Sequence, residues 1–454
     1  MIGDFTYFLL CILSIVFFCN KKYELFIICY ATIISNCWGL INNGGIAMYD
    51  WILFVTIATC IAGRYRNKNF FNIRKDKIGG AILILVWYAI VVAIISPFRG
   101  VGSLGYCLMT ARMELFYLIY FVFRTIPYCS FEKAIRIIFK LSLVTCILYY
   151  LQFIGINLLI FGNTDDYVTD GYMRYANIPV FTIPIFAFFF TAHNIRHRIY
   201  GLAAWGGIIL LSQTRGLIIG LAVSIIIYLA KHWRNIKKSI VITIIALCIS
   251  TSGMLAYRFS SEGSTGEGIM EELPTFLYLI NSGEYKKLES SNIIMEKGTF
   301  VFRLLIIFEK CEYLSQRPFS LLFGAGSYHE RAPQTKALPF VFGSNSEIGR
   351  AKVDTDDVML ISRFFRYGLV YLGIFIIFLL RCYKSTDLSD TDGSRIFKIL
   401  WWTYLIGGIA GNYYSHISYM SIYFLFLVNS LKQNIINTRC INSYCSHSND
   451  KKII

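Results

Sequence analysis

The sequence has few charged residues, and this scarcity decides the class of protein to which the chain belongs. Only 15% of its 454 residues are Asp, Glu, Lys or Arg, whereas 56% are hydrophobic, and the mean hydropathy is +0.56. Soluble globular domains carry about 25% charged residues. The composition therefore excludes a soluble globule and predicts a polytopic membrane protein.

Acidic residues are scarcer than basic ones, with 27 Asp and Glu against 43 Lys and Arg, and the net charge is +16. A basic balance of this size can indicate a nucleic-acid-binding protein. Here the basic residues gather in short loops between apolar runs, as they do on the cytoplasmic side of membrane proteins. We therefore expect no nucleic acid among the partners, and we expect the basic loops to face anionic membrane lipid.

The first apolar segment, residues 5–19, lacks a basic region before it and a small-residue cleavage site after it. A removable signal peptide needs both features, so this segment is expected to remain as a membrane span. A span needs about 20 mostly apolar residues. By this criterion the expected spans are 5–19, 23–41, 45–62, 78–97, 106–126, 136–161, 177–192, 199–212, 216–230, 239–256, 357–380, 396–412 and 416–431.

The pattern predicts an all-α polytopic membrane protein with about 12–13 transmembrane helices and one large periplasmic loop that contains short helices. The expected parts are a transmembrane bundle over 1–256, the loop over 257–356, C-terminal transmembrane helices over 357–431 and a cytoplasmic tail over 432–454.

The loop 64–77 gives the strongest orientation signal, because it carries six Lys and Arg against one Asp. Short loops of this kind stay in the cytoplasm. Alternation of the spans then places 193–198, 231–238 and 381–395 inside as well, and 257–354 outside.

An arginine interrupts the apolar run 199–230, within the segment LLSQTRGLIIG at 210–220. A guanidinium at the centre of a bilayer costs about 2.5–3.5 kcal/mol. We expect a break into two short helices, with a turn at Gly216 and Arg215 at the outer interface. Two interpretations remain open for Arg215, a side chain that reaches the interface from an apolar helix and a cation that binds an anion.

The large loop has three further features. Residues 299–314 have the apolar period of a helix that carries Arg303, for which Glu309 is a possible ion-pair partner. The segment LLFGAGSYHE at 321–330 contains Gly324 and Gly326, which allow close approach of the backbone to a ligand or to a neighbouring helix. An aspartate cluster, in which helix capping explains one or two members, then opens a helix. It consists of Asp354, Asp356 and Asp357.

These motifs in this order resemble the O-antigen ligase/polymerase superfamily. The shared features are the Gln-x-Arg-Gly break, the single outer loop with an arginine on a helix, GAG, and a helix that ends in RYGLVYLG at 366–373. In ligases that helix opens with a histidine, whereas here DTDD occupies the place and the nearest histidine is His329. The departure favours the Wzy-type O-antigen polymerase branch.

The resemblance implies a metal-independent glycosyltransferase of GT-C type, without cofactor, on the periplasmic side of the bacterial inner membrane. It would move a glycan from undecaprenyl diphosphate to a hydroxyl of another lipid-linked repeat unit. Arg215 and Arg303 are the expected diphosphate-binding cations, because the guanidinium fork suits phosphate oxygens. The expected base is Asp356 or Asp357, ranked before His329.

Several further residues are candidates. Arg112 either pairs with Glu114 on its own helix, reaches the interface, or contacts the diphosphate. Arg174 and Tyr328 are expected to bind glycan. A membrane-bound chain-length regulator is the partner that the resemblance implies. The competing classes are a ligase that transfers the glycan to lipid A-core, and a lipid-linked oligosaccharide flippase or other transporter.

The loop charges generate a prediction of topology. A cysteine introduced by Ser344→Cys should react with a membrane-impermeant thiol reagent from the periplasmic side, whereas a cysteine within 64–77 should react only after the inner membrane is permeabilised. Labelling of the Ser344→Cys variant only after permeabilisation would contradict the whole site assignment.

Overall fold

The structure is a computed structural model, and it describes part of the chain. The described residues are 2–35, 48–74, 76–153, 167–169, 172–174, 178–192, 195–212, 214–232, 268–287, 299–342, 344–346, 349–351, 353, 358–387, 391–408, 413–414 and 416–449. The aspartates at 354, 356 and 357 and the expected span 239–256 lie outside them.

Helices occupy the apolar runs of the sequence. The bundle contains α1 (Ile2–Cys19), α2 (Tyr23–Ser35), α3 (Met48–Arg66), α4 (Lys77–Ile95), α5 (Leu104–Leu115), α6 (Ile119–Thr125), α7 (Tyr128–Phe153), α8 (Thr182–Thr191), α9 (Ile195–Leu211), α10 (Arg215–His232), α16 (Met359–Thr386), α17 (Asp392–Gly407) and α18 (Ile417–Asn449). Each expected span that falls on described residues overlaps at least one of these helices, and 106–126 is divided between α5 and α6.

The loop region contains α12 (Gly268–Ser282), α14 (Thr299–Ser315) and α15 (Pro318–Phe323). The helix expected over 299–314 is therefore present as α14. Two short antiparallel hairpins modify the expected all-α fold, β1 (Tyr167–Thr169) with β2 (Tyr172–Arg174) and β3 (Ser344–Ser346) with β4 (Gly349–Ala351).

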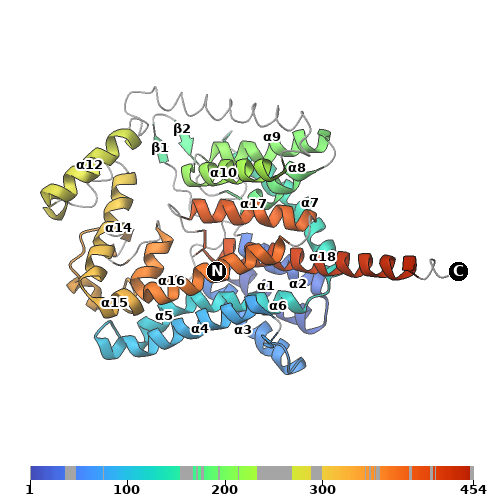
Figure 1. Ribbon diagram of the computed structural model, residues 1–454, viewed down its shortest axis with the longest axis horizontal. Coiled ribbons are helices and arrows are strands. Elements are labelled where there is room, and N and C mark those ends of the chain that lie inside the picture. The colour runs from blue at the N-terminus through green and yellow to red at the C-terminus, as the bar shows by residue number, and fades with distance from the viewer. Residues whose placement is uncertain are drawn as a thin grey trace.

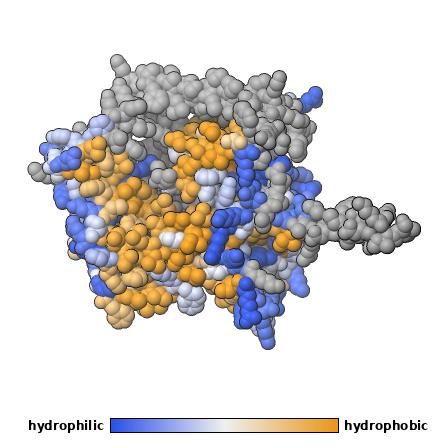
Figure 2. Space-filling view, in the orientation of Figure 1, coloured by the Kyte–Doolittle hydropathy of each residue, from blue (hydrophilic) through white to orange (hydrophobic). Residues whose placement is uncertain are grey.

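Within the described residues, four helices are long and apolar enough to cross a membrane. They are Lys77–Arg99, Leu104–Thr125, Tyr128–Gln152 and Leu360–Thr386, and five shorter apolar helices accompany them. Hydrophobic residues cover the middle of the face in Figure 2, and hydrophilic residues gather on both sides of this band. The fold is therefore helical and compatible with a multi-pass membrane protein.

Figure 1 shows α4, α16, α18, α17 and α10 side by side across the molecule, with α12, α14 and α15 at one end. The opposite end, here called the basic end, contains residues 19–24, 64–74, 76–77, 124–133, 381–387 and 391–398 with Lys231 and Lys432. Asp387 pairs there with Lys231 (2.6 Å) and Lys398 (2.8 Å). The structure thus brings the basic loops 64–77 and 381–395 to the same end.

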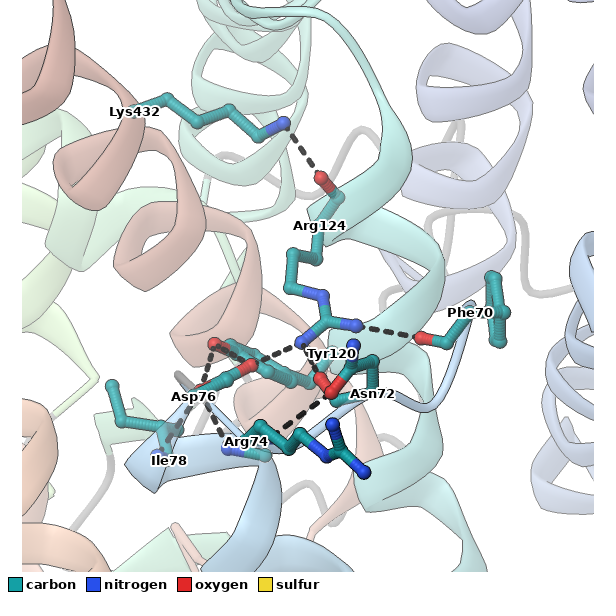
Figure 3. Close-up of polar contacts among 9 residues, drawn as sticks. Phe70, Asn72, Arg74, Asp76, Ile78, Tyr120, Arg124 and Lys432 are labelled. Carbon is teal, nitrogen blue, oxygen red and sulfur yellow. Dashed lines mark hydrogen bonds and ion pairs between the residues drawn. The ribbon is translucent and has the colours of Figure 1, made fainter. Parts of the chain in front are cut away.

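A polar cluster ties the basic end together (Figure 3). The Asp76 carboxylate caps α4 by accepting from Ile78 N (3.1 Å) and pairs with Arg124 of α6 at 2.5 Å. Arg124 also donates to the carbonyl of Phe70 (2.6 Å), and Lys432 of α18 donates to the carbonyl of Arg124 (2.9 Å). One guanidinium therefore joins the basic loop to α6, and Lys432 adds α18.

The expected break in LLSQTRGLIIG is present, because α9 ends at Leu211 and α10 begins at Arg215. The turn assigned to Gly216 is wrong, since Gly216 is the second residue of α10. A Cβ added to Gly407 of α17 would lie 3.3 Å from the carbonyl oxygen of Gly216. A Cβ added to Gly220 of α10 would lie 2.7 Å from the carbonyl oxygen of Thr403 of α17. Small residues let the two helices pack closely, as in membrane helix pairs.

Helix α16 is broken at Gly368, which has φ 77° and ψ −174°. The break removes the partners of the preceding carbonyls, and a buried carbonyl needs another donor. Three donors supply the bonds: Ala325 N to the carbonyl of Phe365 (2.7 Å), Gly326 N to that of Arg366 (3.3 Å), and the Tyr88 hydroxyl to that of Tyr367 (2.9 Å).

The glycines of GAG approach this broken helix and not an empty space. Gly324 has φ +84°, and a Cβ there would stand 2.2 Å from the carbonyl oxygen of Arg366. A Cβ on Gly368 would stand 2.3 Å from the carbonyl oxygen of Leu322. Two backbones are therefore in direct contact at Gly324 and Gly368, whereas a Cβ on Gly326 would meet the Val101 side chain at 2.7 Å.

This contact generates a prediction for Gly368→Ala. The substitution combines a left-handed φ with a steric clash, and these together should cost about 2–5 kcal/mol of stability. We expect a large loss of thermal stability for the protein in detergent. Gly373→Ala on the same helix is the control, because nothing lies within 4 Å of its Cβ position. Equal melting temperatures for the two variants would contradict the role of the break.

Candidate functional site

The loop region packs onto the first half of α16 at the end opposite the basic end, here called the site end, which holds residues 96–103, 214–216, 324–331 and 359–366. A second hydrophobic core joins α14 to the segment before β3 and to α16. Its buried members include Val301, Leu305, Phe340, Phe342 and Phe365. This core fixes the position of the loop over the site end.

A buried ion pair supports the same core. The Glu309 carboxylate accepts from Val341 N (2.9 Å) and Phe342 N (3.1 Å) and lies 3.6 Å from the Lys310 ammonium. Lys310 donates to the carbonyl of Phe342 (3.1 Å). Glu309 thus pairs with Lys310, whereas the sequence suggested Arg303 as its partner.

Arg363 of α16 lies in the centre of the site end. Its Nε donates to Glu114 at 3.2 Å, and the two side chains are only 6% and 5% exposed. Its Nη2 donates to the Tyr117 hydroxyl (2.6 Å) and to the carbonyl of Tyr414 (2.8 Å), while the Tyr371 hydroxyl donates to Glu114 at 2.5 Å. The pair therefore joins α5, the segment before α18 and both halves of broken α16.

Arg112 does not pair with Glu114, so the intrahelical ion pair considered for them is wrong. The reason is the rotation of α5, which directs Glu114 toward α16 and Arg112 toward α3. Arg112 forms an ion pair with Asp50 of α3 at 2.5 Å. Its partner therefore lies on another helix, which the local sequence did not indicate.

Three arginines surround His329. Burial, together with the positive charges of Arg366, Arg112 and Arg331, lowers the pKa of the imidazole from its ordinary value of 6.5 to about 4. The ring stacks on Tyr106 of α5, with centroids 5.5 Å apart, and Nδ1 accepts from Arg331 N at 3.2 Å. The imidazole is therefore neutral at physiological pH and lies in a strongly positive environment.

Tyr328, the expected glycan contact, is half-buried. Its ring stacks on Phe365 of the second core, with centroids 6.0 Å apart, and its carbonyl accepts from Thr110 at 3.2 Å. These contacts place it between the loop and the bundle. Arg174 belongs to β2, opposite Tyr167, and its side chain lies outside the described part of the structure.

Arg303 and the start of α10 approach the same tyrosine. Burial raises the pKa of the Tyr413 phenol, and the guanidinium of Arg303 counteracts this rise, so the two groups are neighbours. The Tyr413 ring lies 2.8 Å from the Cβ position of Gly407, where the carbonyl of Gly216 also approaches. The structure thus brings α14 near the α10 terminus that carries Arg215, whose own side chain is outside the described part.

Asp356 and Asp357 lie outside the described residues, so the structure does not place the two preferred base candidates. Asp50, Arg363 and Arg366 were not among the site residues expected from the sequence. A signal for the two arginines was present, because SRFFRYG at 362–368 places charges three residues apart in an apolar helix. Such intramembrane charges are costly and mark functional sites.

The site end retains unused hydrogen-bond donors. Within the described residues, Arg112 Nε, Arg363 Nη1 and Arg366 Nε are buried and have no hydrogen-bond partner. Buried donors normally have partners, and guanidinium groups bind phosphate and carboxylate oxygens through paired bonds. The arrangement is therefore suited to an anion of the phosphate class. In the same part of the chain, no group of three His, Cys, Asp or Glu could hold a metal ion.

No protein-family model matches the chain, and no curated protein matches it. The function is therefore argued from the site and from the sequence.

The Arg363 network generates a prediction for Glu114→Gln. Removing the carboxylate leaves a buried guanidinium without its counter-charge, which should cost about 3–5 kcal/mol of stability. The matched control is Glu24→Gln, which breaks an exposed pair with Lys133 (3.3 Å) and should cost at most about 1 kcal/mol. Thermal unfolding in detergent measures both. A Glu114→Gln variant as stable as the control would show that the pair contributes little.

Proposed function

We propose that the chain is a Wzy-type O-antigen polymerase in the bacterial inner membrane. It joins lipid-linked repeat units on the periplasmic face and releases undecaprenyl diphosphate. The observation that carries the proposal is the group of Arg112, Arg331 and Arg366 around His329, beneath the large loop. A fixed positive site of this kind suits a diphosphate leaving group.

The two ends of the bundle support the periplasmic location. Positive loops mark the cytoplasmic side of membrane proteins, and the basic end gathers 64–77 with 381–398. Several arginines at this end form ion pairs or bind backbone carbonyls, as Arg124 does with Asp76 and Arg381 does with the carbonyl of Lys77. The site end then faces the periplasm, where the polymerase acts.

The reaction would form a bond between an acceptor hydroxyl oxygen and the anomeric carbon of the donor glycan. The bond from that carbon to the diphosphate oxygen breaks, and its electron pair stays on the diphosphate. The hydroxyl proton passes to Asp356 or Asp357. Arginines that are already in place would stabilise the charge that develops on the leaving group, so no metal ion or cofactor is required.

Two alternative functions would use the same site. A ligase would use the same donor, with lipid A-core as the acceptor. A flippase or other transporter is favoured by one specific observation, the break of α16 at Gly368 beside buried charges, since broken helices form transporter binding sites. The folded loop over the site end, for which a transporter has no need, favours the enzyme.

The lipopolysaccharide ladder of a deletion strain tests the proposal. A polymerase defect leaves core with a single repeat unit attached, whereas a ligase defect removes every unit from the core. Loss of lipid-linked units from the periplasmic face would indicate the flippase. A membrane-bound chain-length regulator is the protein partner that we expect to recover by crosslinking in the membrane.

Arg215 and Arg303, the two cations that the family resemblance assigns to the diphosphate, give a sharper prediction. Arg215→Lys and Arg303→Lys each keep the charge and lose one of two parallel hydrogen bonds, each worth about 1.5–3 kcal/mol. Polymerisation should slow roughly 10- to 150-fold, leaving mostly single repeat units at normal protein abundance.

The control for both is Arg317→Lys. Arg317 is exposed at the end of α14 and lies over the Tyr313 ring, 4.0 Å from its centroid. Its replacement should leave the ladder unchanged. A normal ladder from Arg215→Lys at matched abundance would mean that this arginine only reaches the membrane interface.

A further inference from the structure

The hydrogen bonds of His329 fix the position of its proton. A backbone N–H can only donate, so the bond from Arg331 N to Nδ1 (3.2 Å) requires an unprotonated Nδ1. The neutral ring therefore carries its proton on Nε2. In this tautomer Nε2 is a hydrogen-bond donor and cannot accept a proton from a substrate hydroxyl.

The charges around the ring come from every element packed against it. Tyr106 stacks on it from α5, which also contributes Arg112 with its partner Asp50 on α3. The loop contributes Arg331 with Glu330 at 3.9 Å, and α16 contributes Arg366. The ring remains neutral because burial disfavours its charged form and because a proton would make it a fourth cation in this group.

We propose that His329, Arg112 and Arg366 form a binding site for a diphosphate diester, and that His329 takes up a proton when this anion binds. The buried Nε groups of Arg112 and Arg366, which lack partners in the described part of the chain, are the other donors. The identity of the anion rests on the proposed function. The coupling of binding to proton uptake follows from the charges alone.

The direction of the coupling follows from the charges. A bound dianion offsets the arginines and favours the charged imidazole, so the pKa of His329 increases from about 4 on binding. If it regains its ordinary value of about 6.5, the affinity for the anion increases about 30-fold from about pH 8 to about pH 5. When both ring nitrogens carry a proton, Nδ1 can no longer accept the hydrogen bond from Arg331 N. The loop at 329–331 must therefore rearrange.

This role changes the assignment of the reaction steps. A ring that donates from Nε2 to the leaving group positions the diphosphate and is not the base for the acceptor hydroxyl. The base then belongs to the aspartates at 356 and 357. His329 becomes the group that links substrate binding to pH.

The test measures binding by the full-length protein in phosphatidylcholine nanodiscs. The probe is P1,P2-diethyl diphosphate, whose charge stays constant between about pH 5 and about pH 8, with affinity measured by calorimetry. The wild type should bind about 30-fold more tightly at the lower pH. His329→Gln keeps a donor near the Nε2 position and cannot titrate, so it should bind within about threefold of wild type at about pH 8 and show no pH dependence.

The control is His416→Gln, which replaces a histidine packed beside Tyr49 and Tyr419 and should keep the wild-type pH dependence. Nanodiscs with anionic phosphatidylglycerol distinguish the source of the phosphate. If the affinity for diethyl diphosphate is the same in these nanodiscs, the site binds the diphosphate diester. If phosphatidylglycerol competes and lowers that affinity, the site binds a lipid headgroup and the proposal is overturned.

A wild-type affinity that does not change with pH, or a His329→Gln variant with the full pH dependence, would also overturn it. The measurement involves no glycan transfer. If the deletion strain has a normal lipopolysaccharide ladder while the protein still shows pH-dependent binding, only the proposed polymerase function is contradicted.

Discussion

The contact on which the site end depends is the one between two backbones, the GAG loop and α16 broken at Gly368. A broken helix in an apolar bundle exposes carbonyls, which must find donors. The loop supplies N–H groups of Ala325 and Gly326, and α4 supplies the hydroxyl of Tyr88. Because the bonds from Ala325 N and Gly326 N exist only when the loop packs on α16, the fold of the loop and the shape of α16 depend on each other.

The site follows from this contact. Tyr328 and His329 follow GAG within three residues, and Arg363 and Arg366 lie within five residues before the break at Gly368. Seating the loop therefore places His329 beside the arginine of α16 without any bond between their side chains. The Glu114 pair with Arg363 fixes the same half-helix to α5, which carries Arg112. Rigid elements thus hold the donors in place, as a preorganised anion site needs.

The two ends of the bundle use positive charge differently. At the basic end, Arg124, Lys231 and Lys398 pair with carboxylates and Lys432 donates to a backbone carbonyl, so these charges hold neighbouring segments together. At the site end, Arg112 and Arg366 keep buried N–H groups without partners among the described residues. Burial and the positive charges of Arg366, Arg112 and Arg331 keep His329 neutral in that group.

The sequence by itself determined most of the helices, the break before Arg215 and the positions of the basic loops, because apolar runs and loop charges act through local physics. The split before Arg215 and the close approach at Gly324 were predictable for this reason. The break of α16 at Gly368 was not predicted, since 357–380 has the pattern of one continuous apolar span. Only the tertiary structure decided the partners of the charges. Arg112 and Glu114 lie two residues apart and face different helices, and Arg363 finds its carboxylate 249 residues away. Such pairs depend on which helices are neighbours and how each is rotated, and no local pattern records either.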